Sequence, residues 1–122
     1  MRIRITVGEV SLEAELNDTP TARKIAEILP FEGPFNTWGD EIYFEIPVQA
    51  ELEQGAKEKV SIGELGYWPT GSAFCIFFGP TPMSQGDKII PASAVNIIGR
   101  VLDDATMLKQ VMNEEKIRLE AL

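Results

Sequence analysis

The sequence predicts a mainly β protein, with seven or eight short strands and two short helices arranged as a β-barrel or a β-sandwich. Short segments in which apolar and polar residues alternate recur along the chain, whereas only two segments have helical spacing. Two helices are too few to connect the strands of a parallel sheet. All ten aromatic side chains lie between Phe31 and Phe78, and a barrel of about eight strands can fill its interior with such side chains.

The first part of the chain predicts a hairpin followed by a helix. Residues 2–7 and 10–16 both alternate between apolar and polar side chains, with Gly8-Glu9 between them as the turn. Thr19 can cap a helix whose first residue is Pro20. Apolar residues at helical spacing then form one face: Ala22, Ile25, Ala26 and Leu29. We expect about three helical turns, ended by Pro30.

The middle of the chain mixes turns with strands. Residues 32–34 predict a turn or irregular link, and residues 38–40 predict a turn before a strand at 41–46. Residues 49–59 are polar and predict a solvated loop. Two further strands are expected within 60–79, joined by a turn at 69–71. The second of them, 73–78, has almost no polar residue, so we expect both of its faces to be covered.

The last third of the chain predicts an extended stretch, a short helix and a closing strand. Residues 89–102 place Val95, Ile97 and Val101 on one face, and Pro91 indicates a sheet edge or a bulge. Asp103 and Asp104 favour a helix start, which we expect to run through about Val111. Residues 115–121 alternate again and predict the final strand.

The composition is that of an ordinary globular protein, which we expect to form one domain over residues 1–122. The 19 acidic and 11 basic residues give a formal net charge of −8, which would repel nucleic acid. The start of the chain has no signal-peptide pattern, and no apolar run approaches the roughly 20 residues of a membrane span. With Cys75 as the single cysteine, we expect a cytoplasmic protein without nucleic-acid or membrane partners.

The sequence contains no histidine, which narrows the chemistry. It excludes Ser-His-Asp and Cys-His nucleophile systems and His-based zinc sites, and one cysteine cannot build a thiolate site. Any acid–base step would fall to Asp, Glu, Tyr or Lys. We expect no cofactor, and we expect Cys75, which lies in an apolar run, to be buried and inert.

Several strings resemble cyclophilins, the prolyl isomerase family. The helix start at 19–25 and the stretches Phe35-Asn36-Thr37 and Gly71-Ser72-Ala73-Phe74-Cys75-Ile76 are similar to cyclophilin segments in the same order. The chain resembles more closely a small prokaryotic family of atypical cyclophilin-like proteins. The strings that carry this resemblance are Phe35–Gly39, Glu41–Phe44, Gly66–Pro69, Phe77–Pro82 and Pro91–Asn96. The resemblance implies a single cyclophilin-like domain, a closed eight-stranded β-barrel with two short helices.

The departures from the isomerase pattern concern the residues that act on the substrate. Thr37 stands where the resemblance places the isomerase arginine, Ala73 where it places a glutamine, and Cys75 where it places a phenylalanine of the proline pocket. No histidine or aromatic residue follows Phe78 to match two later positions. The resemblance therefore implies the fold without the activity.

Candidate ligand-binding residues are those that lie next to turns or polar positions within the aromatic segment and its neighbours. They are Phe35, Asn36, Thr37, Trp38, Glu41, Tyr43, Tyr67, Trp68, Met83 and Asn96. The alternatives are core packing for the rings and backbone capping for the two asparagines. Glu41 and Tyr43 share one strand face; at a barrel mouth Glu41 could be a desolvated base, but we favour a solvated position for both.

Three functional hypotheses remain open. The one we favour is a binding module, a monomer or weak homodimer, that takes a peptide or small ligand in an aromatic groove. The alternative is a weak or divergent prolyl isomerase that uses another cation, such as Arg100. A third is an interaction protein with an exposed edge strand near Pro91. A hydrolase would depend on Glu41 alone and is the least favoured.

Overall fold

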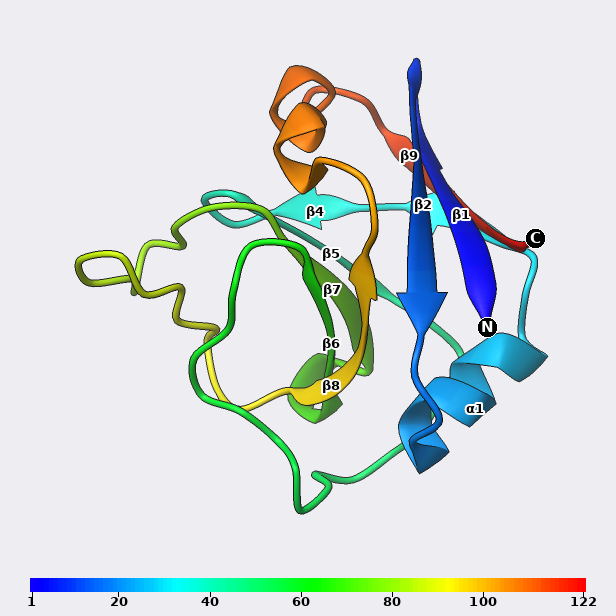
Figure 1. Cartoon of the computed structure of the whole chain (residues 1–122), viewed down its shortest axis with the longest axis horizontal. Coiled ribbons are helices and arrows are strands. Elements are labelled where there is room, and N and C mark those ends of the chain that lie inside the picture. The colour runs from blue at the N-terminus through cyan, green and yellow to red at the C-terminus, as the bar shows by residue number, and fades with distance from the viewer.

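A computed structural model, which describes all residues 1–122, contains one nine-stranded antiparallel sheet in the order β3-β9-β1-β2-β8-β6-β7-β5-β4. The sheet is bent into a nearly closed barrel (Figure 1). Its two edge strands, β3 (Phe31–Pro34) and β4 (Asn36–Thr37), are joined by Phe35 alone, so one bent stretch of chain links both edges. The sheet thus has slightly more strands than the seven or eight expected from the sequence, and counting β3 and β4 as one strand gives eight.

The other strands form the rest of the barrel wall. They are β1 (Arg2–Val7), β2 (Val10–Leu16), β5 (Glu41–Glu45), β6 (Glu64–Trp68), β7 (Ala73–Phe77), β8 (Asn96–Val101) and β9 (Lys116–Ala121). The helices are α1 (Pro20–Glu27) and two short 3₁₀ helices, η1 (Pro69–Gly71) and η2 (Ala105–Gln110). The predicted hairpin is confirmed, with Ile3 paired to Ala14 and Ile5 to Leu12. The predicted short helix after Asp104 is confirmed as η2.

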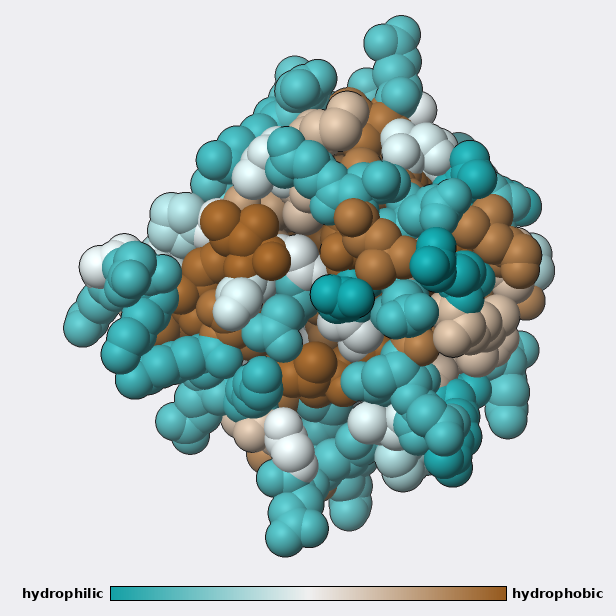
Figure 2. Space-filling model, in the orientation of Figure 1, coloured by the Kyte–Doolittle hydropathy of each residue, from teal (hydrophilic) through white to brown (hydrophobic).

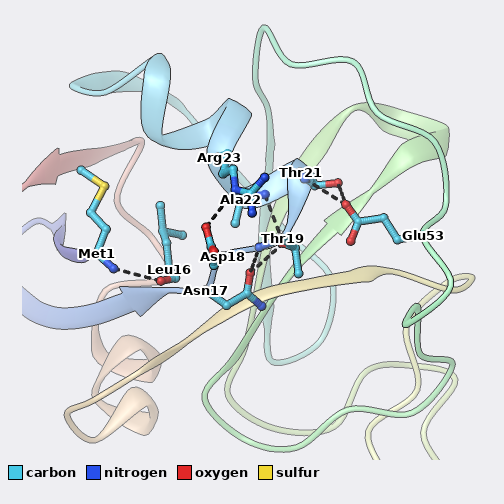
Figure 3. Close-up of polar contacts among 9 residues, drawn as sticks. All are labelled: Met1, Leu16, Asn17, Asp18, Thr19, Thr21, Ala22, Arg23 and Glu53. Atoms are coloured by element: carbon cyan, nitrogen blue, oxygen red, sulfur yellow. Dashed lines mark hydrogen bonds and ion pairs between the residues drawn. The ribbon is translucent and has the colours of Figure 1, made fainter.

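Helix α1 begins as predicted and ends early. Thr19 accepts a hydrogen bond from the backbone N–H of Ala22 at 3.3 Å, and Arg23 pairs with Asp18 at 2.8 Å (Figure 3). The helix has eight residues rather than about three turns. It ends before Leu29 because the residue that precedes a proline is disfavoured in helical geometry.

Two further predictions of secondary structure are wrong. Residues 32–34 are not an irregular link; they belong to β3, which pairs with β9 through long-range contacts that local sequence does not encode. Within 89–102 only β8 is a strand, and Ile97 and Val101 lie on opposite faces. The pairing of β8 with β6 shifts because Ile98 is an extra residue, and such a bulge reverses the alternation beyond it.

The apolar side chains form two separate clusters. The larger has 25 buried residues inside the barrel and includes Ile42, Phe44 and Phe74. The smaller lies on the outer face of β6 and β7. Its members are Val60, Ala73, Cys75, Phe77, Ile89 and Val95. Every residue of β7 is buried, which confirms that both faces of this strand are covered.

Figure 2 shows a largely hydrophilic face on which hydrophobic residues form small patches among polar ones. None of the helices combines the length and the apolar character that crossing a membrane requires.

Candidate functional site

The outer face of β5, β7 and β6 brings together side chains that are far apart in the sequence. Across β5 and β7, Glu41 pairs with Phe77 and Tyr43 with Cys75. Across β7 and β6, Trp68 pairs with Ala73. Since directly paired residues of an antiparallel sheet point to the same face, these side chains share one surface.

A long loop from Gly79 to Val95 covers part of this surface. In Figure 1 it extends to the left of β6 and β7, on the side away from β1 and β2. Val95 packs tightly here because Gly66 has no side chain; a Cβ at Gly66 would lie 3.0 Å from Cγ2 of Val95. The glycine of the Gly66-Tyr67-Trp68 string thus lets the loop approach the sheet.

A pocket of about 230 Å³ lies between the sheet and the loop. Three rings and one carboxyl group contribute to its wall. The lining residues are Trp38, Glu41, Tyr43, Trp68, Cys75, Pro91, Ala92 and Val95.

Both tryptophans are held in place. The indole Nε1–H of Trp68 donates to Oγ of Ser93 at 2.6 Å, and Gly71 leaves room for its six-membered ring, which a Cβ there would meet at 2.8 Å. Trp38 precedes the turn that leads into β5, where its backbone N–H donates to the Glu41 carbonyl at 3.0 Å. The Trp68 ring is therefore positioned before any ligand binds, and the Trp38 backbone is fixed at the turn.

Glu41 is buried, contrary to our expectation of a solvated position, and only 5% of its surface is exposed. Burial raises the pKa of its carboxyl group from 4.5 to about 7, and a hydrogen bond from Cys75 acts in the opposite direction. The expectation failed because alternation along β5 predicts which face a residue occupies, whereas the cover comes from a loop that begins almost forty residues later.

Cys75 is buried as predicted, and burial together with the nearby Glu41 charge raises the pKa of its thiol. The thiol can donate to the Glu41 carboxylate or to the Ala73 carbonyl, 3.8 Å from Sγ. A protonated thiol is a poor nucleophile, so this side chain serves as a wall and a weak donor.

Four of the ten candidate residues line the pocket: Trp38, Glu41, Tyr43 and Trp68. The others lie elsewhere. Phe35 packs against the main core, Asn36 and Thr37 are exposed on β4, and Met83 is 50% exposed. Tyr67 is fully buried inside the barrel, where its hydroxyl donates to the Val48 carbonyl at 2.6 Å.

The Asn96 side chain connects β8 to helix α1 and to the loop at residues 49–59. Its side-chain amide donates to Oγ1 of Thr21 at 3.1 Å and to the Glu51 carbonyl at 2.9 Å, and its oxygen accepts from the Glu53 backbone at 2.8 Å. Glu53 in turn accepts from the backbone and hydroxyl of Thr21 (Figure 3). The loop at 49–59, expected to be merely solvated, is therefore tied to α1 and β8.

Sequence reasoning missed four lining residues: Cys75, Pro91, Ala92 and Val95. A signal for three of them was present, because Pro91–Asn96 is one of the strings that carry the family resemblance. The edge strand expected near Pro91 is absent, since this proline lies in the loop and is buried against the pocket.

The pocket wall contains neither arginine nor lysine. Arg100 lies on another part of the surface, beside Glu15 and Glu64. No group of three or more His, Cys, Asp or Glu side chains is placed to hold a metal ion. The pocket thus offers aromatic rings, one carboxyl and one thiol.

Comparisons with known proteins found a matching family model and similar solved structures. A family model described as Cyclophilin-like matches residues 1–120. The chain is also similar to the solution structure of a hypothetical protein from Archaeoglobus fulgidus, with 44% sequence identity and a TM-score of 0.83. That match covers 100% of this chain and 95% of the other. A comparison with curated proteins found no match.

Proposed function

The chain belongs to the cyclophilin-like family, and from that premise we propose that it is a binding protein whose outer-face pocket holds a small ligand or one side chain of a peptide. The observation that carries the proposal is the pocket itself, where Trp38, Tyr43 and Trp68 surround an open space beside Glu41. Concave, mostly apolar sites with a few polar groups are the usual form of a ligand site.

The size of the pocket limits what it can hold. A volume of about 230 Å³ equals that of roughly seven or eight water molecules at about 30 Å³ each. Drug-sized ligands need about 300 Å³ or more. We therefore favour a small molecule or a single side chain over an extended peptide.

The pocket chemistry supports binding rather than prolyl isomerisation. The uncatalysed peptide bond has a barrier of about 18–20 kcal/mol, and lowering it needs charge directed at the twisting carbonyl. The wall supplies no cation, and Cys75 occupies the position where the resemblance places a proline-pocket phenylalanine. No observation favours the weak isomerase that the sequence left open.

The two tryptophans make the proposal testable, because they are the only two in the chain and both line the pocket. A fragment library screened by ¹⁵N chemical shifts should perturb the indole N–H signals of Trp38 and Trp68 together. Ala92 is exposed at the pocket rim, so Ala92→Phe should block the mouth and abolish these responses.

Ala121→Phe is the matched control, since Ala121 is exposed at the end of β9, outside the pocket wall. It should leave binding unchanged. A library in which no compound moves either indole signal would contradict the proposal. A rate of cis–trans exchange above background in a proline-peptide assay would instead support the isomerase hypothesis.

A further inference from the structure

We propose that the ligand of this pocket is an organic cation, an alkylated ammonium group held against the rings of Trp38, Tyr43 and Trp68 and neutralised by Glu41. The inference rests on the proposed function and names its ligand class. The structure shows three features that this class satisfies together: the rings, the unpartnered carboxyl and the lack of a competing cation.

The rings suit a cation. The face of an aromatic ring attracts positive charge, tryptophan most strongly, and the attraction grows when water is excluded. Two of the three rings here are tryptophan, and all three are half-buried, so each has part of its surface covered and part open. A neutral apolar ligand would use the area of these rings but not their electrostatics.

Glu41 is the only charged residue among the 39 buried residues of the chain. A buried carboxylate ordinarily has a basic partner, because an unpaired charge away from water is unfavourable. None of the seven ion pairs in the structure includes Glu41. With a pKa of about 7 the carboxyl can be neutral by protonation, but once it is ionised its positively charged partner must come from outside the chain.

The lysine side chains of neighbouring segments pair with other carboxylates and not with Glu41. Lys109 pairs with Asp40, and Lys57 pairs with Glu64. The titratable groups that face Glu41 across the pocket are Tyr43 on β5 and Cys75 on β7, and the loop contributes only Pro91, Ala92 and Val95. Neither Tyr43 nor Cys75 carries positive charge in any state, so only a ligand can supply it.

The wall also favours an alkylated ammonium over a bare one. A primary ammonium group has three N–H donors that each need an acceptor. Among the side chains of the wall, only the Glu41 carboxyl is a strong acceptor, and most of the rest is ring or aliphatic surface. Methyl groups on the nitrogen replace those donors with apolar surface, which such walls accommodate.

Choline and its uncharged isostere 3,3-dimethylbutan-1-ol test the inference, because the two differ only by nitrogen against carbon. Tryptophan fluorescence and ¹⁵N shifts report on binding. At pH 8.5 we expect choline to bind at least tenfold more tightly. At pH 5.5 choline should bind more weakly, by up to about thirtyfold, because a carboxyl with a pKa of about 7 is mostly protonated there. Cys75, whose thiol pKa is raised by burial, stays neutral throughout.

Glu41→Gln should remove both the preference for choline and its pH dependence while leaving the binding of the neutral alcohol within about threefold. Glu45→Gln is the matched control, since Glu45 is an exposed acid on the same strand, and it should change neither. Retained choline preference in Glu41→Gln would overturn the inference.

The outcomes also separate this inference from the proposed function. If the alcohol binds as tightly as choline at pH 8.5, the cation inference fails and the binding pocket stands. If neither compound perturbs Trp38 or Trp68, the cation inference fails, and the fragment library alone then decides whether the pocket binds ligands.

Discussion

The two faces of strands β5, β7 and β6 differ in how completely they are packed. Toward the barrel interior, Phe44 is fully buried and stacks on Phe31 and Phe74 with ring centroids 5.7 and 5.2 Å apart. Toward the outside, the cluster has six buried residues instead of 25, and a pocket remains beside Glu41.

The difference shows that one sheet can satisfy stability and binding on opposite sides. The inner face needs no polar group other than the Tyr67 hydroxyl, which has its partner in Val48. The outer face tolerates incomplete packing and a carboxyl without a cation, both of which cost stability. The inner face therefore accounts for the fold, and the outer face carries the candidate function.

The largest expected effect comes from removing a ring on the inner face. Phe44→Ala should destabilise the protein by about 3–5 kcal/mol, because it deletes a buried ring and leaves a cavity. Tyr43→Ala, its neighbour on the outer face, should cost less than half as much, because Tyr43 is only half-buried. Urea unfolding of both variants measures the contrast. Equal losses would show that the two faces contribute alike.

The next effect concerns Glu41 and depends on pH. The carboxyl has a pKa of about 7 in the folded protein and ordinarily 4.5, so the unfolded chain ionises first as pH rises. Stability is therefore lost between pH 4.5 and 7 and stays reduced above that range. Glu41→Gln avoids this loss and should be more stable than the natural protein by about 3 kcal/mol at pH 8.

The same variant should show no advantage near pH 4, where both states of the natural protein carry a protonated Glu41. Thermal or urea unfolding from pH 4 to 8 follows the difference. Glu45→Gln, on an exposed residue of the same strand, should show no comparable pH dependence. A constant difference across the range would mean that Glu41 ionises normally in the fold.

Local patterns in the sequence were enough to predict most of the inner face. Alternation located the hairpin, β5 and β9, and the nearly unbroken apolar run at 73–78 indicated a strand covered on both sides. Two features were beyond such patterns. The pairing of β3 with β9 depends on residues about 85 positions apart, and the bulge at Ile98 depends on how β6 meets β8.

The outer face was predicted less well, because its pocket depends on a loop rather than on periodicity. Alternation placed Glu41 and Tyr43 on one face, but no local pattern indicated that Val95 and Pro91 would cover them. Tyr67 and Trp68 were treated alike, although adjacent strand residues point to opposite faces and only Trp68 lines the pocket.

A smaller loss of stability tests whether Asn96 stabilises the fold rather than the pocket. Asn96→Ala should cost about 1–3 kcal/mol, because it leaves the Glu53 N–H and the Glu51 carbonyl without their partner. Asn36→Ala is the matched control on exposed β4 and should be nearly neutral. Pocket binding should survive in both variants. If the Asn96→Ala variant is fully folded but no longer binds ligand, Asn96 contributes to the binding site.

The smallest expected effect concerns the contact between Cys75 and Glu41. Because a hydrogen bond from the thiol lowers the pKa of Glu41, Cys75→Ala should raise that pKa, as a ¹³C titration of the Glu41 carboxyl can measure. Cys75→Ser keeps a donor and should bring the pKa back toward its natural value. A fall of the pKa in Cys75→Ala would mean that water enters the enlarged pocket and hydrates the carboxylate. The outer face would then resist water only through the fit of its side chains, whereas the inner face excludes it by complete packing.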